Sequence, residues 1–154
     1  PVVVNAKPLK ASQSRNGQFR GVVADMYVLE GYEAHNEILI DQVEGTNRVA
    51  IRNCNQCSVQ ITADVTYLIL DGVRNTNVTV FGCRSVEVSK CMWVEVNFRQ
   101  NHGLDPAVRL TDSFDTTFHF PSTIDVADMP QKVHATRCNG VHLKGADGTS
   151  VKVS

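Results

Sequence analysis

The chain has 154 residues, of which 42% are hydrophobic and 20% are charged, as is ordinary for one soluble globular domain. Its formal net charge of −1 argues against non-specific binding to nucleic acid or to an anionic membrane surface. There is no run of 18 apolar residues and nothing that resembles a signal peptide, so we expect no membrane insertion.

The N-terminal residues predict two pieces that precede the main body of the fold. Residues 1–20 open with three valines and then become polar, so we expect an arm, of which residues 2–4 could add to a sheet edge. Residues 22–32 predict an opening strand, with Tyr27 and Tyr32 closing one end of the fold. A repetitive fold needs such atypical terminal pieces because its ends would otherwise expose the apolar interior.

One unit then recurs seven times: an apolar residue, any residue, and a second apolar residue. The triplets are Ile38/Ile40, Val49/Ile51, Val59/Ile61, Leu68/Leu70, Val78/Val80, Val86/Val88 and Val94/Val96. Their first members lie 11, 10, 9, 10, 8 and 8 residues apart. This alternation is the period-2 signature of strands with one buried face.

The connectors between the triplets are too short to contain a crossover helix, which excludes an ordinary parallel α/β sheet. An antiparallel meander and a solenoid of stacked coils both remain. Alternate triplets recur at 16 to 21 residues, and only Asp71-Gly72 offers a two-residue hairpin turn within the repeat. We therefore favour an all-β solenoid, a right-handed parallel β-helix.

After residue 96 the spacing loosens, with a longer connector over residues 97–106. The alternation resumes at Val108/Leu110, Phe118/Phe120, Ile124/Val126, Val133/Ala135 and Val141/Leu143. Residues 145–148 form a turn between 141–143 and 151–153, which predicts a terminal hairpin that either caps its own coil or pairs with another molecule. We expect an arm over 1–20, a β-helix over 21–140 and a hairpin over 141–154.

The five cysteines are an odd number, which favours a reduced, cytoplasmic compartment. Cys54 and Cys57 are a close pair, but no second pair or nearby histidines complete a zinc site, so we expect no metal. The simpler interpretation is that Cys54, Cys83 and Cys91 are small buried side chains stacked from coil to coil.

We expect no enzymatic chemistry and no cofactor. The sequence has no glycine-rich phosphate loop and no hydrolase or metalloprotease motif. His119, His134 and His142 are middle residues of triplets, so they should point outward, where they could align as a ladder on one face. Aligned exposed polar residues are more often solvated surface than ligands.

The other outward positions are polar or charged, and they predict a flat surface that either suits docking to a large protein partner or is simply the solvated surface of the fold. They are Arg52, Gln60, Thr62, Arg74, Thr79, Arg84, Glu87, Lys90, Glu95, Asn97 and Arg99.

Three stretches resemble the C-terminal domain of cyclase-associated protein in their order and spacing across roughly residues 25 to 115. They are residues 26–65 (MYVLEGYEAHNEILIDQVEGTNRVAIRNCNQCSVQITADV), 85–102 (SVEVSKCMWVEVNFRQNH) and 108–113 (VRLTDS). After Ser113 the chain keeps the spacing of that family but not its residues, and the tail after the last strands is short.

That resemblance implies a β-helix that binds monomeric actin, preferentially the ADP form, and promotes nucleotide exchange and filament turnover without chemistry of its own. It also implies a cytoplasmic homodimer that exchanges its C-terminal hairpin. The candidate dimer contacts are Val141, Leu143, Val151 and Val153, and the candidate actin contacts are Arg52, Gln60, Arg74, Lys90, Glu95, Asn97 and Arg99.

Tubulin-binding cofactor C and its relatives share this kind of coil and are the alternative, as activators of a small GTPase. Their activity depends on an arginine in a Gln-x-Arg strand motif, which acts as an arginine finger. The corresponding strand here, residues 91–96, has no Gln-x-Arg, and Arg99 stands in a different context.

Overall fold

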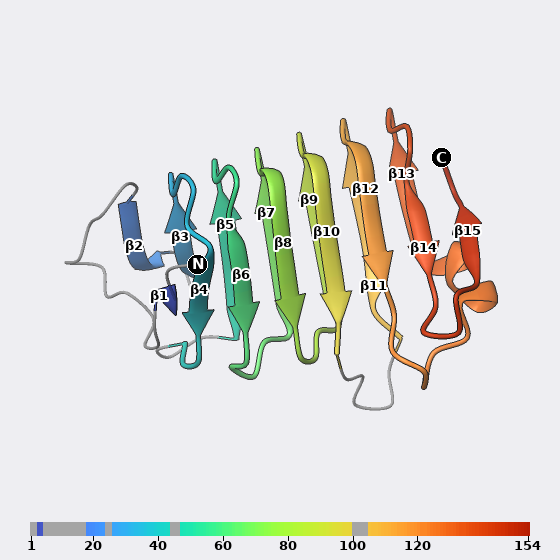
Figure 1. Ribbon diagram of the computed structural model, residues 1–154, viewed down its shortest axis with the longest axis horizontal. Helices are drawn as coiled ribbons and strands as arrows, with labels where there is room; N and C mark the ends of the chain where they lie inside the picture. The colour runs from blue at the N-terminus through green and yellow to red at the C-terminus, as the bar shows by residue number, and fades with distance from the viewer. Residues whose placement is uncertain (1–2, 5–17, 24–25, 44–46, 100–104) are drawn as a thin grey trace.

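The computed structural model describes residues 3–4, 18–23, 26–43, 47–99 and 105–154. Two sheets face each other along the length of the molecule, and successive coils are stacked side by side (Figure 1). The eight-stranded sheet contains β1 (Val3–Val4), β4 (Glu37–Ile40), β6 (Ser58–Ile61), β8 (Arg74–Val80), β10 (Met92–Phe98), β12 (Phe114–His119), β14 (His142–Lys144) and β15 (Ser150–Lys152), in that order. The seven-stranded sheet contains β13 (Val133–Thr136), β11 (Ala107–Thr111), β9 (Ser85–Ser89), β7 (Tyr67–Asp71), β5 (Arg48–Arg52), β3 (Met26–Glu30) and β2 (Gln18–Val23).

Each coil contributes one strand to each sheet, and strands from neighbouring coils pair in parallel. In the seven-stranded sheet the register aligns Tyr27, Val49, Leu68, Val86, Val108 and Val133 in one row. In the eight-stranded sheet it aligns Ile38, Val59, Val78, Val96, Phe118 and Leu143. The solenoid prediction is therefore confirmed, and the antiparallel meander is not the fold.

The core lies between the two sheets and consists of the inward rows. Both apolar members of all seven triplets are buried, at 4% exposure or less. Val, Ile and Leu suit these positions because their branched side chains pack well on a pleated surface. Toward the C-terminal end, aromatic residues take the inward positions, and the ring centroids of Phe98 and Phe120 lie 5.2 Å apart.

The two ends of the solenoid depart from the parallel pattern. At the N-terminal end, β1 pairs in parallel with β4, as expected for a valine segment at a sheet edge. The single opening strand expected over residues 22–32 is wrong: β2 and β3 are separate strands that pair antiparallel. Residues 5–17, which belong to the expected arm, lie outside the described residues, and β2 begins before the expected boundary at residue 21.

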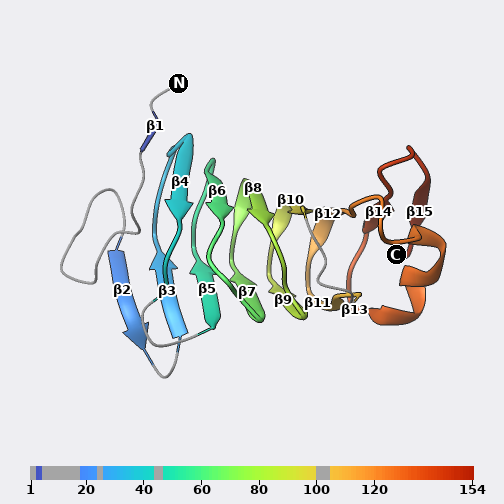
Figure 2. The same cartoon turned by 90° about the horizontal axis from the view of Figure 1, so that it is seen from below.

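At the C-terminal end a short 3₁₀ helix, η1 (Val126–Lys132), covers the last coil (Figure 2). The strand expected at Ile124/Val126 is therefore wrong, because the Asp125 side chain accepts a hydrogen bond from the Ala127 backbone N–H and starts this helix. Val126 and Met129 of the helix are buried. Ala135, expected to point inward, is exposed on β13, which forms the edge of its sheet.

Candidate protein-binding surface

The chain passes from the seven-stranded to the eight-stranded sheet through the same corner in every coil. Two residues of each corner, three positions apart, have left-handed backbone with φ between 49° and 77°. The pairs are Gly31/Ala34, Asn53/Gln56, Gly72/Asn75, Lys90/Trp93, Asp112/Asp115 and Arg137/Gly140. Gly, Asn and Asp dominate because they tolerate this conformation best. The strand alternation does not predict these corners, because the left-handed residues lie between the triplets.

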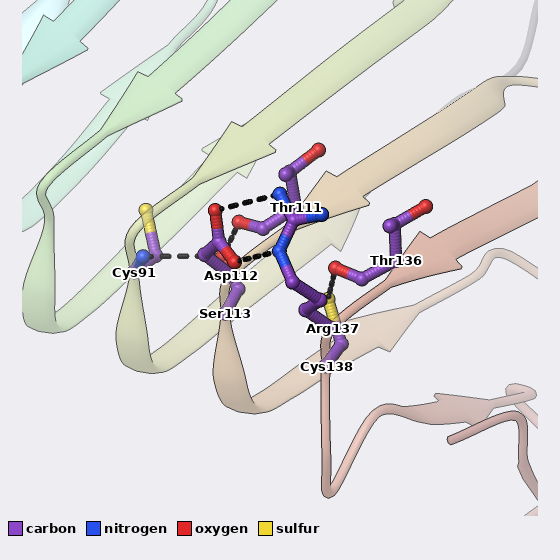
Figure 3. A network of polar contacts seen from close by, with 7 residues as sticks. All are labelled: Cys91, Thr111, Asp112, Ser113, Thr136, Arg137 and Cys138. Carbon is purple, nitrogen blue, oxygen red and sulfur yellow. Dashed lines mark hydrogen bonds and ion pairs between the residues drawn. The ribbon is translucent and has the colours of Figure 1, made fainter.

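The residue after the first left-handed position is a cysteine or serine in four of the six corners, and Tyr32 and Val73 fill this position in the other two. The thiols of Cys54, Cys91 and Cys138 and the hydroxyl of Ser113 each donate to the backbone carbonyl two residues earlier, at 3.0–3.4 Å. The Ser113 hydroxyl also accepts a hydrogen bond from the backbone N–H of Cys91, in the neighbouring coil, at 3.1 Å (Figure 3). Cysteine and serine therefore interchange in this column as structural groups, as the sequence predicted for Cys54 and Cys91. The prediction is wrong for Cys83, which lies outside this column in the connection between β8 and β9, where its thiol donates to the Thr66 and Ser85 carbonyls.

The environment of Cys54, Cys83 and Cys91 disfavours the thiolate, whereas the hydrogen bond with Cys54 lowers the pKa of the Cys57 thiol to about 7, and burial is what shields this thiol from reagents. Burial raises the pKa of Cys83 and of Cys91 to about 11. A hydrogen bond with Cys57, together with burial, raises the pKa of the Cys54 thiol. All five cysteines are free, and only Cys138 is not buried.

Native-state titration with a thiol-specific disulfide reagent should therefore modify Cys138 rapidly and the other four thiols only on unfolding. The stoichiometry should be about one thiol per folded chain and five in denaturant, since buried thiols in apolar surroundings are inert. Rapid modification of two or more thiols in the folded protein would contradict this picture of the corners.

The same row of corners carries the exposed apolar side chains. Trp93 is 54% exposed and Phe114 is 42% exposed, and they are the large hydrophobic side chains that the described residues leave open to solvent. Phe114 is paired in register with Met92, which immediately precedes Trp93. We call Met92, Trp93 and Phe114, with the flanking cations Arg74 and Lys90, the aromatic corner. Interface hot spots are enriched in tryptophan and arginine, so this surface is a candidate for protein binding.

An ion pair lies beside the aromatic corner. Arg137 Nε donates to Asp112 Oδ1 at 2.5 Å, and Arg137 Nη2 donates to Asp112 Oδ2 at 3.1 Å, which joins two neighbouring coils (Figure 3). The Arg137 guanidinium holds the pKa of the Asp112 carboxyl below its usual value. Both side chains are solvent-exposed, so the ion pair contributes little to the stability of the fold.

The structure separates the seven predicted contact residues into four places. Gln60, Glu95 and Asn97 lie on the outer face of the eight-stranded sheet, where Gln60 and Asn97 flank Thr79 in one row. Glu95 Oε1 lies 3.0 Å from Nε2 of His119 on the neighbouring strand. These residues form part of the expected flat polar face.

The four predicted cations lie elsewhere, so the expectation of one flat surface is wrong for them. Arg52 ends β5 in the other sheet, in register between Glu30 and Asp71. Arg74 and Lys90 belong to the aromatic corner, and Arg99 follows the end of β10. The alternation shows that a residue points outward, but it does not show on which sheet or at which corner the residue lies.

The three histidines, which could have aligned on one face, do not form a ladder. His119 and His142 belong to the eight-stranded sheet, where His119 is in register with Lys144 and His142 with Thr117. His134 lies in the other sheet, in register with Arg109. Within the described residues, no three His, Cys, Asp or Glu side chains are grouped so that they could hold a metal ion.

The terminal hairpin is present and lies on its own coil. β14 pairs in parallel with β12 and antiparallel with β15, and the turn is closed by a hydrogen bond from the Gly145 N–H to the Thr149 carbonyl at 2.8 Å. Val141 and Leu143 are fully buried, whereas Val151 and Val153 are partly buried against the core. In the described part of the chain, no helix has the length and hydropathy needed to cross a membrane.

Comparison with known proteins agrees with this architecture. The family model for the adenylate cyclase associated (CAP) C terminal matches residues 18–113, which run from β2 to the corner before β12. The structure is similar to the crystal structure of cyclase-associated protein from Cryptosporidium parvum, with a TM-score of 0.73 and 13% sequence identity over 93% of this chain and 87% of that chain. No curated protein sequence matches the chain. Because the family model covers more than half of the sequence, the chain belongs to the family of C-terminal domains of adenylate cyclase-associated proteins.

Proposed function

We propose that this domain binds monomeric actin, preferentially in its ADP form, and promotes exchange of the bound nucleotide in the cytoplasm. The observation that supports the proposal is membership of an actin-associated family, through the family-model match over residues 18–113. Its contribution to filament turnover would be a binding effect, with no covalent step carried out by this chain.

The solenoid suits such a role because it is a rigid scaffold. Outward side chains in the middle of the eight-stranded sheet lie between inward neighbours that are buried in the core, as Gln60 does between Val59 and Ile61. Its position is therefore fixed before a partner arrives, and little conformational entropy is lost on docking. A surface that binds an open, nucleotide-releasing conformation of actin more tightly than the closed conformation would raise the population of open actin. It would thereby speed the exchange of the bound nucleotide.

We further propose that two copies associate by exchanging the hairpin over residues 141–154, so that Val141, Leu143, Val151 and Val153 pack against the partner's last coil instead of their own. The supporting observation is that this segment forms an antiparallel hairpin at the end of the solenoid, where β14 pairs with β12 and β15 is the last strand of its sheet. A dimer would present two actin-binding faces to two monomers.

The binding step is testable with fluorescently labelled ADP-actin monomers, whose anisotropy should rise and saturate as the domain is added. Reversal of Lys90 to Glu should weaken binding more than reversal of Arg52 to Glu. Arg52 lies between two carboxylates in register, whereas Lys90 is exposed at the corner, and an outward charge chiefly affects the encounter with a partner.

Two results would count against the binding proposal. The first is no change in anisotropy with folded domain at concentrations well above those of the labelled actin. The second is equal binding by the domain to an unrelated acidic protein, which would indicate charge attraction alone. No observation favours the GTPase-activating alternative, because β10 carries no Gln-x-Arg and Arg99 follows its end.

A further inference from the structure

The aromatic corner interrupts a polar surface that is otherwise regular. The residues at the position of Trp93 in the other coils are Ala34, Gln56, Asn75, Asp115 and Gly140. Those at the position of Phe114 are Glu33, Asn55, Arg74, Met92 and Asn139. Large aromatic side chains thus occupy these two positions at two neighbouring coils and nowhere else among the described corners, where the other residues are small, polar or, at Met92, aliphatic.

Fold stability does not explain the tryptophan. Its backbone has φ of 55°, which is unfavourable for a bulky side chain, and its ring is 54% exposed, so it gains little from burial. Asn75 fills the same position in the preceding coil with a residue type that favours this conformation. A strained and exposed aromatic residue on a rigid scaffold indicates a binding function rather than a structural one.

The charges around the corner define what a partner must offer. Among the described residues, neither Arg74 nor Lys90 forms an ion pair, whereas the nearby Asp112 carboxylate is already bound by Arg137. Asp115 occupies the position of Trp93 in the following coil, between the register pairs Met92/Phe114 and Val94/Thr116. The surface therefore presents two aromatic rings with two available cations on one side, which complements an apolar recess with carboxylates at its rim.

We propose that the aromatic corner is the anchor of the actin interface, with Trp93 and Phe114 entering an apolar recess on the actin monomer and Arg74 and Lys90 facing carboxylates at its rim. This inference rests on the proposed function and adds to it the residues that dominate the affinity. Buried aromatic and arginine side chains carry most of the binding energy of an interface. The outer face of the eight-stranded sheet would then add contacts of matching shape and charge around them.

The test is a set of variants titrated into labelled ADP-actin monomers. Trp93→Asn places the residue type of Asn75 at the left-handed position, so the melting temperature should stay the same or rise. We expect this variant, and Phe114→Ala, to raise the dissociation constant at least about ten-fold, as truncation of a hot spot does. The matched control is Arg109→Glu, at an exposed position on the outer face of the seven-stranded sheet. Its dissociation constant for ADP-actin should stay within about two-fold of that of the unmodified domain.

A second readout uses the fact that Trp93 is the sole tryptophan of the chain. Domain labelled with 5-fluorotryptophan gives one ¹⁹F resonance, and unlabelled actin gives none. Addition of ADP-actin should move this resonance and remove its H₂O/D₂O isotope shift, because the ring leaves water.

Each outcome decides between the claims. If the unmodified domain binds actin but Trp93→Asn binds equally well and the ¹⁹F isotope shift persists, the anchor assignment is overturned and the proposed function stands. If Trp93→Asn instead loses self-association, measured by light scattering, and keeps its actin affinity, the corner is an interface between copies of this chain and the assignment is again overturned. If the unmodified domain binds no actin, the proposed function and the anchor fail together.

Discussion

Replacement of Phe118 with alanine should lower the free energy of unfolding by about 3–5 kcal/mol, the range for removal of a buried aromatic ring. Phe118 is fully buried on β12, between Val96 and Leu143 in register. Its ring stacks on that of Phe98, with centroids 6.3 Å apart and an interplanar angle of 16°. Neighbouring coils are held by strand pairing, so the cavity should not collapse easily.

Urea denaturation followed by far-UV circular dichroism measures this change, and the chain supplies its own control. Phe114, four residues earlier on the same strand, is 42% exposed, so Phe114→Ala should cost less than about 1 kcal/mol. Similar losses for the two variants would show that the core is not organised around the inward face of β12.

Deletion of residues 145–154 should convert a dimer into monomers if the hairpin is the interface that we propose. The deletion removes β15 and the hydrogen bonds that join Val141 to Val153 and Ser154, and it leaves the edge of β14 unpaired. Light scattering coupled to gel filtration should then report the mass of one chain rather than two. We expect the far-UV spectrum to remain that of a β protein, because the parallel coils before β14 are intact.

A point variant controls for damage by the truncation. Lys152 is exposed on β15, so Lys152→Ala should leave both the hairpin and the dimer in place. Association that persists after the deletion would place the interface on another part of the molecule.

The coil architecture could be predicted because its cause is local. Every triplet from Ile38/Ile40 to Val94/Val96 alternates in the way that a strand with one buried face requires, and all of these side chains are buried. The terminal hairpin could also be predicted from the sequence, since Gly145 and Gly148 bracket a short turn between two apolar pairs.

The candidate site could be predicted only in part, because its position depends on the corners. Alternation gives the outward direction of Gln60 and Asn97, but the left-handed residues decide where a coil turns. Every other corner has at least one Gly, Asn or Asp at its left-handed positions, whereas this corner has Lys90 and Trp93. The sequence therefore gives no local signal that these two residues lie at a corner. The helix η1 was missed for a similar reason, since Ile124 and Val126 imitate a strand triplet.

The central claim is our proposal that this domain acts on actin monomers by binding alone. The direct measurement is the release of a fluorescent nucleotide from ADP-actin monomers as the domain is added. We predict that the release rate increases with domain concentration and saturates, and that actin itself remains chemically unchanged. An unchanged release rate, at domain concentrations where the solenoid is shown to be folded, would contradict the central claim.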